Sequence, residues 1–295
     1  MMSLPERRAL SRELTALLDA SVGDALRHFA ETGPGHGHRI GIAGPPGAGK
    51  STLINGLVRC REAGGTTAVL AIDPTSPVSG GSLLGDRIRM ADLADRQDVY
   101  LRSVPSRAMR NGLCDNLADL LAALGRRGFD RIILETVGVG QAETDVRRMV
   151  DTLVLVVPPN AGDAVQAMKA GLLECADVFV VSKAEDPGAE RTRSEIADIA
   201  ERLSRGGWHP PVVLTRADGN GCAALEAAIQ EHSAWLSVHR DAGEAARRHR
   251  QAHLRDLLIR RIDEVLDLAP DLVDAPLPDA FARAAALMGP GGDPS

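Results

Sequence analysis

Eight residues early in the chain have the types and spacing to hold a nucleoside triphosphate. Residues 44–51 read Gly-Pro-Pro-Gly-Ala-Gly-Lys-Ser, which is the pattern G-x-x-x-x-G-K-[ST]. Glycines allow backbone N–H groups to turn inward around a phosphate, Lys50 can reach the β- and γ-phosphates, and the Ser51 hydroxyl can bind Mg²⁺. A glycine-rich surface turn is the alternative. It is disfavoured because an apolar strand pattern at 39–43 precedes the loop and a helical pattern at 52–58 follows it.

Acidic residues that close apolar stretches are the expected partners of a bound metal ion. Asp73 follows the apolar run 66–72, and Glu135 follows the run 131–134. The carboxyl ends of parallel strands meet at one edge of a sheet, so both side chains should lie near the phosphates. The polar loop at 79–87 has the composition of a switch segment, although a plain connecting loop is the alternative. The predicted metal ligands are Ser51, Asp73, Asp86 and Glu135.

Lysine is rare in this chain, and its three positions are informative. Of the 34 lysines and arginines, only Lys50, Lys169 and Lys183 are lysines. A compact ammonium on a flexible stem serves purposes that a planar guanidinium does not. Lys183 follows the apolar run 177–181, where a base-reading loop is expected. Lys169 is a candidate for stabilising charge during phosphoryl transfer, with a solvated helix lysine as the alternative.

Two further residues belong to the predicted hydrolytic site. Gly138 comes three residues after Glu135, and its N–H could sense the γ-phosphate. No glutamine stands out as a residue that activates water, but Gln141 is a candidate. The absence of a clear candidate predicts slow hydrolysis that a partner accelerates.

Composition limits the class of protein. The chain has 295 residues with 44% hydrophobic and 25% charged residues, and its formal net charge is −6. An acidic chain with 2% aromatic residues does not fit a nucleic-acid binder. No apolar run approaches the length needed to cross a bilayer, and the polar start does not read as a signal peptide. We therefore expect a cytoplasmic protein that binds neither nucleic acid nor membrane. The four cysteines are widely spaced and are expected to be reduced thiols.

Apolar stretches alternate with helical patterns along most of the chain. Continuous apolar runs, rather than alternating ones, indicate strands buried on both faces, as in a parallel sheet. The predicted fold is α/β, with a doubly wound, mostly parallel sheet. The predicted strands are 39–43, 66–72, 99–101, 131–134, 151–157, 177–181 and 211–215. The predicted helices are 4–32, 52–58, 113–124, a start at 161–171 and the region after 223.

The chain resembles the MeaB/ArgK family of P-loop GTPases, which are associated with methylmalonyl-CoA mutase. The resemblance covers about residues 36–236 and rests on several motifs beyond 44–51. They are Asp73-Pro74-Thr75-Ser76, 80–86, Glu135-Thr136-Val137-Gly138-Val139-Gly140-Gln141, and Gly162-Asp163 with Gln166, Lys169 and Gly171. The last of these is called switch III in that family.

The resemblance implies a GTPase that acts as a chaperone and gatekeeper for an adenosylcobalamin-dependent acyl-CoA mutase. It also implies a homodimer joined through C-terminal helices. Older family names describe an arginine/ornithine transport kinase. The expected organisation is an N-terminal helical segment at 1–35, a P-loop GTPase domain at 36–236, and a C-terminal helical extension with a disordered tail at 237–295.

The sequence departs from the family pattern where the base is read. The family loop Asn-Lys-x-Asp appears here as Ser182-Lys183-Ala184-Glu185, and a Ser-Ala pair that contacts the guanine oxygen appears as Arg216-Ala217. Ser182 cannot make the loop-bracing bonds of the asparagine amide. A nucleotide-binding protein with relaxed base choice and a small-molecule kinase therefore stay open as alternatives. A metal-insertion GTPase is disfavoured because the sequence has no Cys-x-x-Cys or His-rich run.

The full predicted site joins these candidates around GTP and Mg²⁺. Lys50, Lys169 and Gln141 are the predicted catalytic residues. The nucleotide would contact Gly44, Pro45, Pro46, Gly47, Ala48, Gly49, Lys50, Ser51, Thr52, Gly138, Ser182, Lys183, Glu185 and Ala217.

Overall fold

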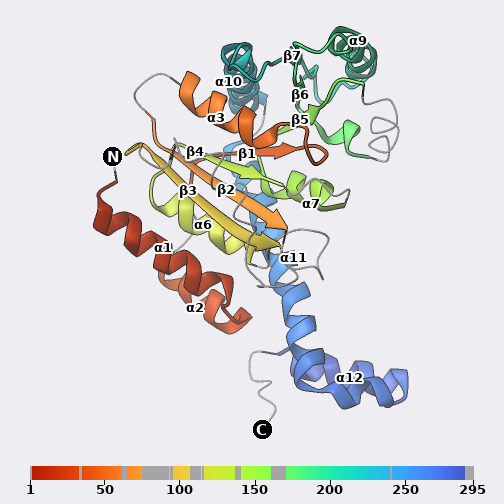
Figure 1. Ribbon diagram of the computed structural model, residues 1–295. Helices are drawn as coiled ribbons and strands as arrows, with labels where there is room; N and C mark the ends of the chain where they lie inside the picture. Colours follow the sequence, from red (N-terminus) through yellow and green to blue (C-terminus); the bar gives the residue numbers. More distant parts are fainter. Residues whose placement is uncertain are drawn as a thin grey trace.

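Seven parallel strands form one sheet at the centre of the computed structural model (Figure 1). The structure describes residues 2–32, 35–61, 65–74, 93, 96–106, 114, 116–136, 141–160, 171–239 and 241–289. The order of strands across the sheet is β3-β2-β4-β1-β5-β6-β7. Their bounds are β1 His38–Ala43, β2 Thr67–Pro74, β3 Val99–Ser106, β4 Arg131–Glu135, β5 Thr152–Val157, β6 Val178–Val181 and β7 Val212–Leu214.

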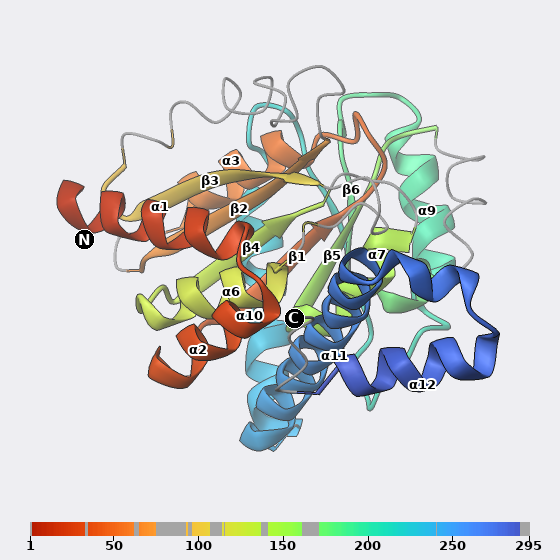
Figure 2. The ribbon, with the colours of Figure 1, turned by 90° about the horizontal axis from the view of Figure 1, so that it is seen from below.

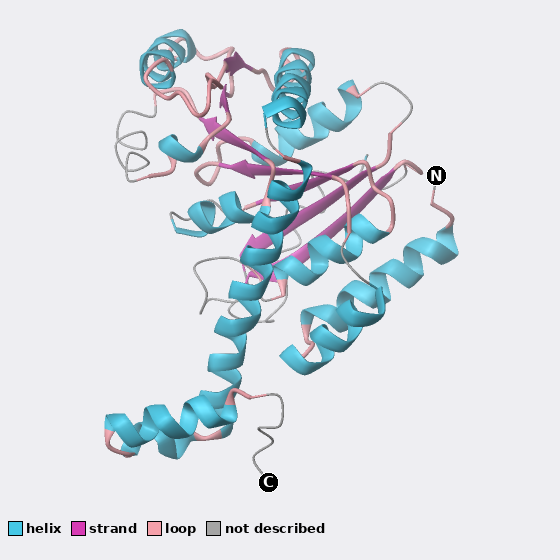
Figure 3. Cartoon of the chain, turned by 180° about the vertical axis from the view of Figure 1, so that it is seen from behind, coloured by secondary structure: helices cyan, strands magenta, loops and turns pink. Residues whose placement is uncertain are grey.

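Helices cover both faces of the sheet, as Figure 3 shows. The cluster on one face joins α3 and α10 to the sheet, for example through Ile54, Ile229 and Ile42. The cluster on the other face joins α1, α6, α7 and α9 to it. The helices are α1 Leu4–Leu18, α2 Val22–Thr32, α3 Lys50–Cys60, α6 Leu117–Arg126, α7 Gln141–Met149, α9 Ala189–Ala200, α10 Cys222–His239, α11 Ala242–Leu268 and α12 Leu277–Leu287, with short 3₁₀ turns η1 Leu173–Cys175 and η2 Pro270–Asp274.

The predicted fold class is confirmed, but several predicted elements have other bounds in the structure. The helical stretch 4–32 is two helices, because α1 ends at Leu18 and α2 begins at Val22. Helix α6 begins at Leu117 rather than 113, after Asn116 with a φ of 62°. Strand β3 continues from 101 to Ser106, and Arg102 in its polar part donates to the Ser11 carbonyl oxygen of α1 at 2.8 Å. Helices α7 and α9 were not predicted, and the helix start expected at 161–171 lies almost wholly outside the described residues.

Helices α3 and α10 pack closely where Gly56 of α3 lies against Cys222 of α10. A Cβ atom on Gly56 of α3 would lie 2.4 Å from the Cys222 sulfur, so a larger residue would push the two helices apart. Burial raises the pKa of Cys222 to about 11, and it therefore stays a neutral thiol at neutral pH. All four cysteines lie among the described residues, and none of them is in a disulfide, as expected.

The long helix α11 packs against the rest of the protein as far as Glu264, whose carboxylate accepts a bond from the Val22 N–H of α2 at 2.7 Å, and then continues toward α12 (Figures 1 and 2). Two carboxylates outside α11 bind its side chains and hold the helix in place. Asp119 of α6 binds His253 and Arg260, each at 2.7 Å. Asp151, just before β5, accepts a bond from Arg248 at 3.2 Å. The predicted domain boundary at 236 falls inside α10, which runs to His239. Helix α11 is joined to α6 and to the start of β5 by side-chain contacts as well as by the chain.

Acid should release the contact between α6 and α11. Burial opposes ionisation of Asp119, but His253 and Arg260 outweigh it and hold the pKa of Asp119 below its ordinary value of 3.8. A lowered folded pKa contributes stability above the unfolded value, and that stability is lost as pH falls through the folded pKa. Asp119→Asn should therefore cost about 1.5–3 kcal/mol near neutral pH. The difference from the parent should shrink below pH 3.8. Urea unfolding of the parent and of Asp119→Asn, measured from neutral pH to below pH 3.8, gives this difference in unfolding free energy. A difference in unfolding free energy that does not change with pH would contradict the prediction.

Candidate nucleotide-binding site

The predicted phosphate loop connects β1 to α3, as the pattern required. Gly44 has a φ of 144°, and a Cβ atom there would lie 2.3 Å from the Val156 carbonyl oxygen of β5. Gly49 precedes the first residue of α3 and has a φ of 89°. Side chains rarely adopt these angles, so glycine is needed at both positions. The loop is thus built to carry backbone N–H groups close to a ligand at the start of a helix, where anions are favoured.

Lys50 lies inside this loop rather than outside it. Its ammonium donates to the carbonyl oxygens of Gly44 at 2.8 Å and Pro45 at 3.1 Å, and its side chain is 7% exposed. These contacts hold a positive charge in the ring of backbone that surrounds a β-phosphate in such loops. The charge therefore stands where the triphosphate would lie.

The metal-binding end of the site brings three predicted ligands to one place. The Ser51 hydroxyl donates to Glu135 Oε1 at 2.8 Å, and this contact is buried. Glu135 is in register with Ile42 of β1 and Ala71 of β2, so Asp73 lies two residues further along β2. Since side chains alternate along a strand, Asp73 and Glu135 project from the same face of the sheet. Both are buried.

These residues fit a magnesium ion that is only partly bound by protein. Hydroxyl and carboxylate oxygens are ligands that Mg²⁺ prefers. Within the part of the chain that the structure describes, no group of three or more His, Cys, Asp or Glu side chains could hold a metal ion alone. Magnesium commonly keeps several waters and takes its other ligands from substrate phosphates, so one hydroxyl and two carboxylates suffice.

The predicted base-reading residues lie where β6 and β7 end. The Ala184 N–H donates to the Thr215 carbonyl oxygen at 3.0 Å, which joins the loop 182–185 to the loop that carries Ala217. Lys183 has a φ of 51°, and Lys183, Glu185 and Ala217 are exposed. Ser182 is 5% exposed. Among the described residues, the Ser182 hydroxyl has no hydrogen-bond partner, so the loop is not braced from this side chain.

Four predicted residues are not placed by the structure. Asp86, Gly138 and Lys169 lie outside the described residues. Gln141 begins α7, but its side chain is not described. Sequence reasoning missed Asn160, which lies three residues after the end of β5 and contacts the base-reading loop. In the sequence, Asn160 is marked only as a polar residue that directly follows Pro158 and Pro159 after an apolar strand.

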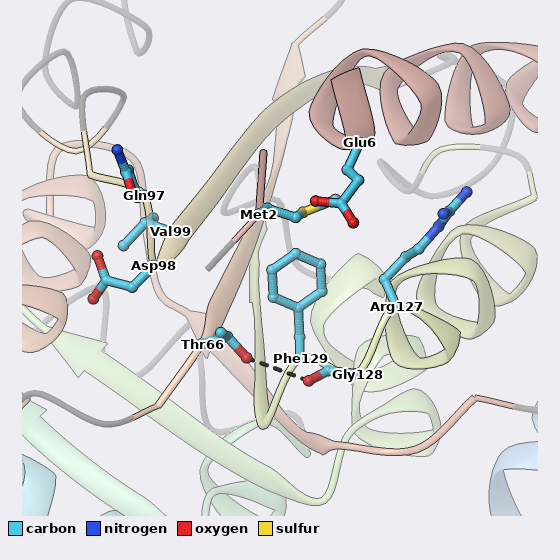
Figure 4. Close-up of a pocket in the computed structure, with 9 residues that line it drawn as sticks. All are labelled: Met2, Glu6, Thr66, Gln97, Asp98, Val99, Arg127, Gly128 and Phe129. Carbon is cyan, nitrogen blue, oxygen red and sulfur yellow. Dashed lines mark hydrogen bonds between the residues drawn. The ribbon is translucent and has the colours of Figure 1, made fainter. Parts of the chain in front are cut away.

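Two cavities lined by described residues lie away from this site. One has a volume of about 260 Å³, and its residues Thr66, Val99 and Phe129 stand at the amino ends of β2, β3 and β4, opposite the phosphate loop. Figure 4 shows the Phe129 ring beside Met2, and Thr66 bonded to the Gly128 carbonyl. The second, of about 430 Å³, also lies at the amino ends of strands, beside His38 and Arg131. Neither includes a predicted site residue.

A glycine-rich loop between β1 and α3 of a parallel sheet, with Lys50 and Ser51 at its end, defines a P-loop nucleotide-binding protein. Comparison with known proteins then identifies the family. The model of the family "Methylmalonyl Co-A mutase-associated GTPase MeaB" matches residues 18–271. The chain belongs to this family of GTPases, as the resemblance predicted.

Several known proteins are similar to most of the chain. A putative GTPase from Pyrococcus horikoshii is 41% identical over 252 residues, which are 83% of this chain and 78% of that protein. The GTPase ArgK of Escherichia coli is 40% identical over 75% of this chain and 63% of its own length. The mouse protein named methylmalonic aciduria type A homolog, mitochondrial, is 36% identical over 73% of this chain and 53% of its own length.

A solved structure supports the fold. The structure of an LAO/AO transport system kinase covers 98% of this chain and 99% of its own, with a TM-score of 0.59 and 22% identity. At this identity the likeness shows a shared fold alone. Within the described residues, no helix is long and apolar enough to cross a membrane.

Proposed function

We propose that this protein is a Mg²⁺-dependent GTPase that serves as a chaperone and gatekeeper for an adenosylcobalamin-dependent acyl-CoA mutase. The observation that carries the proposal is the geometry at the end of the P-loop. Lys50 lies within the loop backbone, and the Ser51 hydroxyl meets Glu135 at 2.8 Å. The family to which the chain belongs is named for its association with methylmalonyl-CoA mutase, and this supports the partner.

The chemistry would be in-line attack of water on the γ-phosphate. Loop N–H groups and Lys50 hold the β- and γ-phosphates and stabilise the charge that develops between them. Lys169 is proposed to add a second positive charge, the Gly138 N–H to sense the γ-phosphate, and Gln141 to orient water. We expect turnover without the partner to be slow, below about 1 s⁻¹.

Three of the described residues would hold the magnesium ion, and Asp86 is proposed as a fourth. Ser51 would bind it directly, and Asp73 and Glu135 through water, because both carboxylates stand at the ends of adjacent strands. When bound, magnesium neutralises part of the phosphate charge and fixes the orientation of the two terminal phosphates.

The C-terminal helices supply a surface for a homodimer. Leu254, Leu258, Ile262 and Leu266 stand four residues apart along α11, and their exposed fractions lie between 43% and 55%. Residues at this spacing lie on one side of a helix. On α12, Leu277 is 82% exposed and Phe281 is 75% exposed. An apolar surface of this kind is typical of an interface, and we propose that a second copy of the chain covers it.

GTP hydrolysis measured with and without magnesium, and with and without a purified adenosylcobalamin-dependent acyl-CoA mutase, tests the proposal. We expect slow phosphate release that needs magnesium but no acceptor molecule, and that the mutase accelerates. Phosphate transfer to a small molecule in place of release would favour the kinase alternative. No phosphate release and no GTP binding would exclude the proposal.

A second candidate is a P-loop nucleotide-binding protein with relaxed base choice. The buried Ser182 hydroxyl, which lacks a hydrogen-bond partner among the described residues, favours it. Glu185 also carries one methylene more than the aspartate of the family loop, so the loop must shift to keep the same contact with guanine. The affinities for GTP, ATP and XTP, measured by titration, distinguish a guanine-specific protein from one with relaxed base choice. Equal affinity for ATP and GTP would exclude guanine specificity.

A further inference from the structure

Asn160 reaches the base-reading loop from the end of β5. Its side-chain amide donates to Asp186 Oδ1 at 3.1 Å, and its backbone N–H donates to the Thr192 hydroxyl at 3.2 Å. Asp186 directly follows Glu185, the predicted base-reading carboxylate. Asp186 Oδ1 also accepts from the Gly188 N–H at 2.8 Å. Asp186 Oδ1 therefore bonds both to the segment after β5 and to the residue before α9, directly beside the base-reading loop.

The contact is close and depends on particular residue types. A Cβ atom on Gly188 would lie 2.1 Å from the Asn160 amide oxygen, so the amide rests directly on the Gly188 backbone. Asn160 has a φ of 59°, a left-handed angle that asparagine tolerates better than most residues. The backbone at Asn160 therefore takes an uncommon conformation that places its amide against the loop.

The base-reading loop has few other supports. Its own turn is closed by the Asp186 N–H bonded to the Lys183 carbonyl at 2.9 Å, and backbone bonds join Ser182 to Val157 and Ala184 to Thr215. The Ser182 side chain, at the position of the family's bracing amide, has no hydrogen-bond partner among the described residues. Asn160 lies in the segment after β5, and its side chain does bond to Asp186 directly after this loop.

We infer that Asn160 is a positioning residue for base recognition: from the segment after β5 it holds Asp186, directly after the loop 182–185, and takes over the support that Ser182 cannot give. This inference rests on the proposed function, because it assumes that the loop reads a guanine base. Asn160 would act through Asp186 on the adjoining Glu185, without touching the nucleotide. Loss of the brace should weaken binding of the base and leave binding of the phosphates unchanged.

Asn160→Gly is the sharpest variant, because glycine accepts the same left-handed backbone and only the amide is lost. Calorimetry should show an affinity for GDP about 5- to 30-fold weaker than that of the parent. Affinity for inorganic tripolyphosphate, which occupies the P-loop but has no base, should not change. For hydrolysis, KM for GTP should rise while kcat stays near the parent value, since ground-state binding is what is lost.

Three further variants and a matched control test whether the effect passes through Asp186. Asp186→Ala should weaken GDP binding by a similar factor, and the double variant should be no worse than either single one. Ser182→Asn in the Asn160→Gly background should restore part of the affinity. Gln230→Ala removes another amide-to-carboxylate bond, to Glu226 at 2.8 Å on α10, and should bind GDP like the parent.

Unchanged GDP affinity in Asn160→Gly, or equal losses for GDP and tripolyphosphate, would overturn the inference while the proposed function stands. The parent protein is titrated first, and failure of the parent to bind GDP would instead refute the proposed function, and the inference with it.

Discussion

Replacing Lys50 with alanine should nearly abolish the activity. The Lys50 ammonium lies in the loop, bonded to the Gly44 and Pro45 carbonyl oxygens at 2.8 and 3.1 Å. It would face the bridging and γ-phosphate oxygens, where charge develops during hydrolysis. A preorganised donor of this kind contributes about 10²- to 10³-fold to turnover, and GTP affinity should fall as well. Calorimetry with a slowly hydrolysed GTP analogue and magnesium, together with a phosphate-release assay, measures both effects.

The control for Lys50→Ala is Arg59→Ala, which removes an exposed positive charge from the last turn of the same helix α3. Arg59→Ala should bind GTP like the parent, and the melting temperatures of both variants show whether the fold is intact. If folded Lys50→Ala binds the analogue as tightly as the parent, the P-loop does not hold the triphosphate and the proposed function is wrong.

Replacing Glu226 with alanine should cause the largest loss of stability. Arg131 at the start of β4 donates two bonds to Glu226 of α10, at 2.6 and 2.7 Å. The two side chains are 7% and 9% exposed, so the pair is shielded from water. Removing one partner leaves a buried charge without its counter-charge, which costs about 3–5 kcal/mol. Urea unfolding monitored by circular dichroism measures the change.

The double variant Arg131→Met with Glu226→Leu distinguishes the effect of an unpaired buried charge from the effect of lost packing. Apolar residues of similar volume often replace a buried ion pair at little cost, so the double variant should be more stable than Glu226→Ala. GTP binding should be close to that of the parent, because the pair lies at the amino end of β4, opposite the P-loop. A loss below about 1 kcal/mol in Glu226→Ala would show that the pair is screened by solvent.

The main elements of the fold could be predicted because the strands of this sheet are buried on both faces. Runs such as 153–157 and 178–181 are continuously apolar, which is typical of strands buried on both faces. Helices α7 and α9 escaped prediction because their sequences are mostly polar. In α9 only Ala189, Thr192, Ile196 and Ala200 are buried, and a stripe with so few large apolar residues gives a weak signal.

Contacts between distant residues were the part of the site that the sequence could not supply. Ser51 and Glu135 are 84 positions apart, and their bond depends on β4 lying beside β1. Asn160 and Asp186 are 26 positions apart, and they meet because the segment after β5 passes the start of α9. Spacing along the chain specifies neighbours within a loop or a helix turn, but not across strands.

The sequence by itself determined the chemistry of the phosphate loop, since the glycines, Lys50 and Ser51 act within eight consecutive residues whose backbone geometry is local. It also indicated most of the strands, since short and continuously apolar runs are typical of strands buried on both faces of a sheet. The tertiary structure decided which acidic side chain meets Ser51 and brought Asn160 to Asp186. Those contacts follow from strand order and register, which are set by the packing of both faces of the sheet against helices far away in the chain.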